Sequence, residues 1–328
     1  IQHQYNLIFT SYHPKKYRRI LSFIKNVATL PLKINRFTRY KKFNNFIRNN
    51  LKLSKKIRSY SGIKKISNKY DAFIVGSDQV WNSKITKGLN SYFLLNFVSS
   101  NRLKISYAAS IGKSFLTDEE KKEFLTSLKT FNFISVREKE AADLLLPLTN
   151  KQISVVMDPT FLLTKRDYKA IEKEIKGLDK YILIYTTESN KNIVDFTNFL
   201  AKEKKLKIIS LNRTNEIDWN YFAASPGEFL TLIKNATYII TNSFHCTCFS
   251  IIYEKNFISV PHSTRGSRII ELLEKANLSN RIVNFNGEKD MDVIHEEINY
   301  KEVANNLRPY ITTSREFLVE SLNSKKKN

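Results

Sequence analysis

Residues 237–254 read TYIITNSFHCTCFSIIYE, and the apolar pattern of this stretch decides the fold class. An apolar run at 238–240 ends at the polar triplet 241–243, and apolar residues then recur at helical spacing as far as Tyr253. This pattern predicts a buried strand, a tight turn and a helix. Ser243 is a favourable N-cap, so the free amides of the helix start would face an anion. His245 lies in that first turn, where it either serves a ligand site or packs under a loop.

Strands and helices alternate from Tyr70 onward, which is typical of parallel sheets covered by helices. We expect strands near 72–75, 103–109, 132–136, 153–157, 181–186, 206–211, 237–241, 257–260 and 281–285. We expect helices near 118–130, 138–146, 191–204, 226–235, 245–254 and 267–277, and a last helical segment, 302–322, broken at Pro309.

The turn-forming sequence Asp158-Pro159-Thr160 divides these elements into two series. The expected fold is therefore α/β, with two doubly wound Rossmann-like domains facing a cleft. The first domain would comprise residues 1–160, including a basic helical segment at 1–69, and the second residues 161–328. The C-terminal helices are expected to pack back on the first domain.

The formal charge of +23 is concentrated near the N-terminus, because residues 1–69 contain 18 Lys or Arg and no Asp or Glu. Between residues 14 and 32, apolar and basic side chains separate onto two faces of a helix, as in surface-binding helices. Such a segment suits an anionic membrane, a nucleic acid or an acidic substrate. The alternative is a helix that packs on its own domain and leaves its charges in water.

The two cysteines, Cys246 and Cys248, form neither a disulfide framework nor a metal site by themselves. Their scarcity suits a reducing compartment, and we expect a cytoplasmic protein. No apolar run approaches the roughly 20 residues that a membrane-spanning helix needs. We expect no metal site.

Polar residues follow the strands of the first series at the points where these strands end. They are Gly76, Ser77 and Asp78 after 72–75, Ser110 after 103–109, Arg137 after 132–136, and Asp158 after 153–157. Because the carboxyl ends of parallel strands share one edge, these residues would meet Asn242, Ser243 and His245 of the second series. A guanidinium, an imidazole, helix amides and carboxylates suit the binding of a small phosphorylated anion and the transfer of a proton.

Several of these residues also have structural interpretations. Asp78 could cap the segment after it, and Asp158 before a proline is interpreted as a turn former. Arg137 and Glu138 could form an exposed pair of little energetic value, although an arginine that ends a buried strand favours an anionic ligand. Arg268 could clamp a ligand or lie on the rim of the cleft.

The ordered set of motifs resembles the polysaccharide pyruvyl transferase family. The matching segments are YDAFIVGSDQVWN at 70–82, SYAASIG at 106–112, ISVRE at 134–138, DPT at 158–160, SPGEFL at 225–230, NSFH at 242–245 and SRI at 267–269. The resemblance covers about residues 70–285 and implies a fold similar to that of B-type glycosyltransferases. It also implies that an opening strand and a glycine-bearing loop precede the region where this sequence starts.

The resemblance implies transfer of a pyruvyl group from phosphoenolpyruvate to two sugar hydroxyls, as a cyclic ketal, without a cofactor. The acceptor would be a surface polysaccharide or its lipid-linked precursor. The family resemblance associates Arg137 and His245 with phosphoenolpyruvate. Many members carry Arg two positions before this histidine, where this chain has Ser243, so anion binding would rely on Arg137, helix amides or Arg268. We assign proton transfer to His245, with Asp78 on the acceptor side.

Two other functions fit the sequence. One is a B-type glycosyltransferase that uses a nucleotide sugar, and the other is a non-catalytic module that binds anions through residues 1–69. As a pyruvyl transferase, the chain is expected to associate reversibly with the anionic inner leaflet of a membrane and not with nucleic acid. The oligomeric state stays open at this point.

Overall fold

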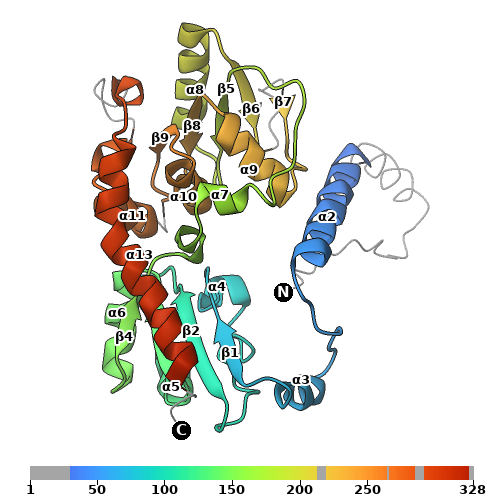
Figure 1. The fold of residues 1–328 in the computed structure, drawn as a ribbon, viewed down its shortest axis with the longest axis vertical. Coiled ribbons are helices and arrows are strands. Elements are labelled where there is room, and N and C mark those ends of the chain that lie inside the picture. The colour runs from blue at the N-terminus through green and yellow to red at the C-terminus, as the bar shows by residue number, and fades with distance from the viewer. Residues whose placement is uncertain (1–29, 213–218, 264–265, 285–291, 325–328) are drawn as a thin grey trace, which may run out of the picture.

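The structure, a computed structural model, describes residues 30–212, 219–263, 266–284 and 292–324, which form two parallel sheets surrounded by helices (Figure 1). The first sheet has the strand order β1-β2-β3-β4. Its strands are β1 (Ala72–Val75), β2 (Leu103–Ala109), β3 (Phe133–Val136) and β4 (Ile153–Val155). The associated helices are α3 (Tyr60–Ser67), α4 (Ser83–Thr86), α5 (Asp118–Leu128) and α6 (Lys139–Leu145), followed by the 3₁₀ helix η1 (Leu146–Leu148).

The second sheet is doubly wound, because its strand order, β7-β6-β5-β8-β9, reverses beside β5. Its strands are β5 (Tyr181–Tyr185), β6 (Lys207–Ser210), β7 (Trp219–Asn220), β8 (Tyr238–Thr241) and β9 (Asn256–Ser259). Its helices are α8 (Lys191–Lys204), α9 (Pro226–Asn235), α10 (Phe244–Ile252) and α11 (Ser267–Lys275). The sheets are linked by η2 (Pro159–Leu162) and α7 (Lys165–Tyr168). The predicted α/β fold with parallel sheets is confirmed.

Local sequence signals explain where the main helices begin. Thr117 and Ser225 each form a complete capping box, with Glu120 and Glu228 respectively, so α5 and α9 start where the sequence predicts. All seven residues of β2 are buried, as expected for a central strand of a parallel sheet. A hydrophobic cluster that includes Trp81 packs on this sheet.

The strand predicted near 281–285 is not formed over its described residues, 281–284. Instead, the 3₁₀ helix η3 (Ser279–Arg281) leads to a single bridge from Ile282 to Ser259. Arg281 turns inward and donates to the carbonyl oxygens of Val293 and Glu296, so this segment binds η4 (Val293–His295) with its side chain rather than extending the sheet. The sequence analysis did not predict β7.

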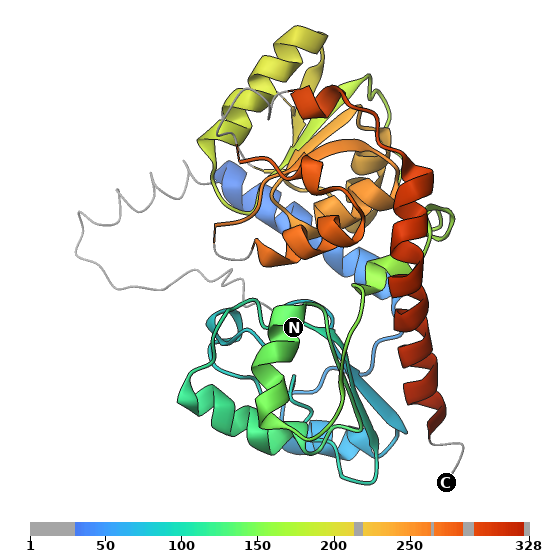
Figure 2. The same ribbon diagram turned by 90° about the vertical axis from the view of Figure 1, so that its left-hand side faces the viewer.

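Helix α13 (Tyr300–Asn323) runs along both halves of the molecule (Figures 1 and 2). Its first half buries Val303 and Leu307 in the core of the second sheet. Farther along, Phe317 packs near Tyr107, and the Ser314 hydroxyl accepts from the amide of Met157. The predicted break at Pro309 was wrong, because packing on both sides holds the helix despite the missing hydrogen bond.

Helix α2 (Leu30–Asn50) contacts the second half of the molecule, whereas the prediction grouped residues 1–69 with the first domain. Lys42 forms an ion pair with Glu228 of α9, with 2.8 Å between Nζ and Oε2. Residues 14–29 of the predicted basic helix lie outside the described residues. Within the described part of the chain, no helix combines the length and hydrophobicity needed to cross a membrane.

Candidate functional site

Asp158 lies at the centre of a charged cluster, three residues after the end of β4, and is almost completely buried. Its Oδ2 accepts from Ser77 Oγ at 2.9 Å and from Arg137 Nη1 at 2.8 Å. Its Oδ1 accepts from the amide and hydroxyl of Thr160 at 3.1 and 2.9 Å. Burial acts to raise the pKa of Asp158, but His245 and Arg137 hold this pKa well below its ordinary value. Asp158 is therefore an anion throughout the neutral range.

Arg137 ends β3 and is surrounded by carboxylates. Besides Asp158, it has Glu138 Oε2 at 3.8 Å from Nε and Asp78 Oδ1 at 3.6 Å from Nη2. Burial acts to lower the pKa of Arg137, and the carboxylates, Asp158 foremost, more than offset this effect and raise it. Among the described residues, neither Nε nor Nη2 has a hydrogen-bond partner, although the side chain is buried. A buried guanidinium with unused donors is suited to an additional anion.

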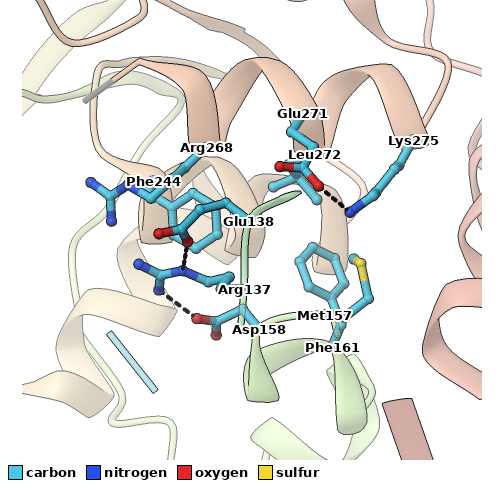
Figure 3. A pocket seen from close by; sticks show the side chains of 10 residues that line it. All are labelled: Arg137, Glu138, Met157, Asp158, Phe161, Phe244, Arg268, Glu271, Leu272 and Lys275. Carbon is cyan, nitrogen blue, oxygen red and sulfur yellow. Dashed lines mark hydrogen bonds and ion pairs between the residues drawn. The ribbon is translucent and has the colours of Figure 1, made fainter. Parts of the chain in front are cut away.

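The ring of Phe244 lies beside two guanidinium groups. The Cζ atoms of Arg137 and Arg268 are 4.4 and 5.5 Å from its centroid, within the range of cation–π contacts (Figure 3). Arg137 comes from the first sheet, whereas Phe244 and Arg268 belong to α10 and α11. The aromatic ring thus holds cations from both halves of the molecule next to each other.

His245 lies in the first turn of α10, at the edge of the second sheet where the strand order reverses between β5 and β8. Its Nε2 is 3.7 Å from Asp158 Oδ2, and its side chain is 41% exposed. Ser243 caps the helix by accepting from the amide of Cys246 at 3.5 Å. The amides of Phe244 and His245 precede the first intrahelical hydrogen bonds and remain for a ligand. His245 therefore combines access to solvent with a buried anion at close range.

A pocket that is open to solvent lies beside this cluster (Figure 3). It is lined from the first half of the chain by Arg137, Glu138, Met157, Asp158 and Phe161, and from the second by Phe244, Arg268, Glu271, Leu272 and Lys275. Two contacts join the halves at its edge. Glu271 Oε2 accepts from the amide of Lys139 at 3.1 Å, and Ser267 donates to Glu140 at 3.2 Å.

The remaining residues singled out in the sequence have distinct structural surroundings. Gly76 has a φ of +119°, and an added Cβ would overlap the carbonyl oxygen of Tyr107, so only glycine fits. Ser110 donates to Glu138 Oε1 at 2.8 Å. Asp78, with a side chain 66% exposed, reaches Arg137 from the solvent side. Asn242 accepts from the amide of Thr187 at 2.6 Å and so fixes the loop after β5.

Three residues of the cluster were overlooked or misjudged. Asp158 does form the expected turn, but it also binds Ser77 and Arg137. Glu138, considered as half of an exposed pair, is buried, and its Oε1 accepts from Ser110 and from the amide of Ile111 at 3.0 Å. Phe244 was not considered. Arg137 itself was the signal that could have identified Asp158. A buried guanidinium requires carboxylates, and Asp158 follows the next expected strand.

Within the described residues, no group of His, Cys, Asp and Glu side chains is arranged to hold a metal ion. Both cysteines are buried, and burial raises the pKa of the Cys246 thiol to about 12, which makes it a poor nucleophile.

Comparison with known proteins gives one family. The model of the polysaccharide pyruvyl transferase family matches residues 5–264, well over half of the chain. No curated protein sequence matches significantly.

Two solved structures are similar in fold. A Listeria monocytogenes protein assigned as a UDP-N-acetylglucosamine 2-epimerase has a TM-score of 0.53 and 11% identity, over 85% of this chain and 83% of that chain. The UDP-GlcNAc 2-epimerase of Methanocaldococcus jannaschii has a TM-score of 0.48 and 18% identity, over 80% and 86% of the two chains. The Listeria structure supports the Rossmann-like architecture of the B-type glycosyltransferases.

Proposed function

Because the chain belongs to the polysaccharide pyruvyl transferase family, we propose that it transfers the pyruvyl group of phosphoenolpyruvate to two hydroxyls of one sugar. The product is a cyclic ketal on a surface polysaccharide or its lipid-linked precursor. The observation that carries this proposal is the buried Arg137, whose Nη2 has no hydrogen-bond partner among the described residues. It lies close to His245, since both side chains contact Asp158.

Phosphoenolpyruvate carries a phosphate and a carboxylate, and the site offers several groups that bind anions. Arg137 offers Nη2, and Arg268, which lies near the same Phe244 ring, is a second cation. The amides at the start of α10 add neutral donors in the favourable direction of the helix dipole. Asp158 and Glu138 keep Arg137 in place, so phosphoenolpyruvate would meet a cation that is already oriented.

The first chemical step needs an acid and a base. The imidazolium of His245 donates its proton to the methylene carbon, while a sugar hydroxyl forms a bond to the adjacent carbon and gives its proton to Asp78. His245 suits the acid role because its Nε2 lies 3.7 Å from Asp158 Oδ2, a carboxylate that can orient the ring, while the side chain reaches solvent. Asp78 suits the base role because its carboxylate faces solvent at the site entrance.

The second step completes the ketal. The bond between the central carbon and the phosphate oxygen breaks, and the phosphate leaves with the electron pair and takes up the proton held by Asp78. Arg137 and the helix amides stabilise the charge that develops on this leaving group. A second hydroxyl of the same sugar then bonds to the central carbon and returns a proton to His245. No resident cofactor or metal enters these steps.

The test is phosphate release from phosphoenolpyruvate in the presence of lipid-linked and free glycans. We expect one phosphate for each pyruvyl group that becomes attached to the glycan. Release of a nucleoside diphosphate from a nucleotide sugar, with no phosphate from phosphoenolpyruvate, would instead identify a glycosyltransferase and overturn the proposal.

A further inference from the structure

We propose that helix α2 and the connector at residues 51–58 form a docking surface for an anionic lipid bilayer. We call these two segments the basic surface. Its apolar residues face solvent to an unusual extent, since Phe37 is 54%, Leu51 55% and Leu53 60% exposed. Leu51 and Leu53 lie two residues apart, and exposed apolar side chains that neighbour one another mark a contact surface rather than a solvated face.

The exposed face of α2 combines aromatic and basic side chains. Phe37, Tyr40, Lys41 and Arg48 are exposed and follow helical spacing along one side. The opposite side is used inside the molecule, because Lys42 pairs with Glu228 and the Cζ of Arg39 lies 5.2 Å from the ring centroid of Phe222. The inward face therefore anchors α2, and among the described residues the outward face stays exposed.

The charge of the basic surface points to an anionic partner. Residues 30–70 contain no Asp or Glu. Six cations of the basic surface are exposed and have no ion-pair partner among the described residues: Lys41, Arg48, Lys52, Lys55, Lys56 and Arg58. A surface this rich in cations is drawn to phosphate-bearing headgroups, and the attraction grows with each cation that approaches them.

The aliphatic residues favour a bilayer over a nucleic acid. Leu51 and Leu53 alternate with Lys52 in an extended connector, so two exposed leucines flank a cation. Nucleic-acid surfaces use aromatic stacking and gain little from exposed leucines. At a bilayer, leucine and aromatic side chains enter the boundary between headgroups and acyl chains while lysines bind phosphates.

The basic surface lies at a useful place for a membrane-bound acceptor. Helix α2 contacts α9 through the Lys42–Glu228 ion pair and lies at the side of the molecule, with one end near the level where the halves meet (Figure 1). Docking would hold the charged site close to a glycan that is attached to a lipid. This last point rests on the proposed function, whereas docking itself does not.

The experiment is sedimentation of the full chain with vesicles of phosphatidylglycerol and phosphatidylcholine in equal parts. The test variant combines Lys52→Gln, Lys55→Gln and Lys56→Gln, and a second variant combines Leu51→Ser with Leu53→Ser. The matched control, Lys122→Gln with Lys129→Gln and Lys202→Gln, removes the same charge from exposed positions elsewhere. Each cation is expected to contribute about fivefold to partitioning, so the test variant should bind roughly 100-fold more weakly than the control.

Wild-type protein should sediment at low salt, be released at high salt, and stay in solution with vesicles of phosphatidylcholine alone. His245→Ala should bind vesicles like the wild type, which separates docking from the reaction. Equal losses in the test and control variants, equal binding to neutral vesicles, or binding to a single-stranded oligonucleotide without binding to vesicles would each overturn the inference.

Discussion

Two arginines, Arg137 and Arg281, are buried to nearly the same degree, with exposures of 5% and 1%, yet their surroundings differ. Arg281 donates to neutral oxygens, namely Asn256 Oδ1 at 3.0 Å and the carbonyls of Val293 and Glu296 at 2.6 Å each. Burial lowers its pKa. Arg137 instead faces three carboxylates, which raise its pKa, and its Nη2 has no hydrogen-bond partner among the described residues.

The comparison distinguishes a structural cation, Arg281, from the cation that we propose binds the ligand, Arg137. Arg281 donates from both Nη atoms to the chain that surrounds it, leaves only Nε without a partner among the described residues, and so fixes the segment between β9 and η4. Arg137 is oriented by carboxylates, and its Nη2 is directed toward the site. In the absence of a ligand this N–H group has no hydrogen-bond partner among the described residues. Burial alone does not distinguish the two roles, whereas the identity of the partners does.

Among the substitutions around Arg137 and Arg281, replacement of His245 should have the largest effect on the turnover number. His245→Ala is expected to lower the turnover number about 10²- to 10⁴-fold, because the proposed proton donor is lost. The melting temperature should change little, since the side chain is partly exposed. Phosphate release under saturating substrate, combined with thermal unfolding, measures both quantities. A turnover number near that of the wild type would exclude His245 from proton transfer.

Asp158→Asn should sharpen the comparison by removing the main counter-ion of Arg137. Breaking a buried ion pair by removing one partner costs about 3 to 5 kcal/mol, so chemical denaturation should show a loss of that size. A loss below about 1 kcal/mol would mean that Asp78 and Glu138 suffice to compensate Arg137.

The same variant carries a pH signature. Because the pKa of Asp158 is lower in the folded chain than its ordinary value of 3.8, its ionised form stabilises the fold above that value. This stabilisation declines as the pH falls below about 4. The difference in free energy of unfolding between the wild type and Asp158→Asn should therefore narrow as the pH falls below about 4. A difference that grows in acid would contradict the assignment.

Arg281→Met should destabilise the fold but leave the binding of phosphoenolpyruvate unchanged. It leaves the carbonyl oxygens of Val293 and Glu296 without donors, at a cost of about 1 to 3 kcal/mol each, partly offset by apolar packing. The Michaelis constant for phosphoenolpyruvate should match that of the wild type in protein that remains folded. A raised constant would remove the distinction between the two arginines.

Local signals in the sequence were sufficient for most of the fold. Alternation of apolar strands and capped helices fixed β1, β2, α5, α8 and α9 within a few residues. The errors came from contacts between distant parts of the chain. The inward turn of Arg281 replaced a strand by a 3₁₀ helix and a bridge, and packing on both halves carried α13 through Pro309.

Local patterns were likewise sufficient to group some residues of the candidate site but not all of them. Residues at the ends of strands could be grouped because parallel strands share an edge, and Asp78, Arg137 and His245 all lie around Asp158. The central position of Asp158 depends on Ser77, from a loop 81 positions earlier in the chain, and on α10, which local patterns do not reveal. Phe244 contacts two guanidinium groups only because α10 and α11 meet the first sheet.

The central claim, that Arg137 holds the anionic donor, is tested most directly by calorimetric titration of phosphoenolpyruvate into three proteins. These are the wild type, Arg137→Ala and Arg137→Lys, where lysine keeps the charge and helps retain the fold. A charge-assisted hydrogen bond contributes about 1.5 to 3 kcal/mol, so the dissociation constant should rise roughly 10- to 150-fold in Arg137→Ala. Arg137→Lys should lie between the two. Equal affinity in all three folded proteins would show that Arg137, like Arg281, serves only the structure.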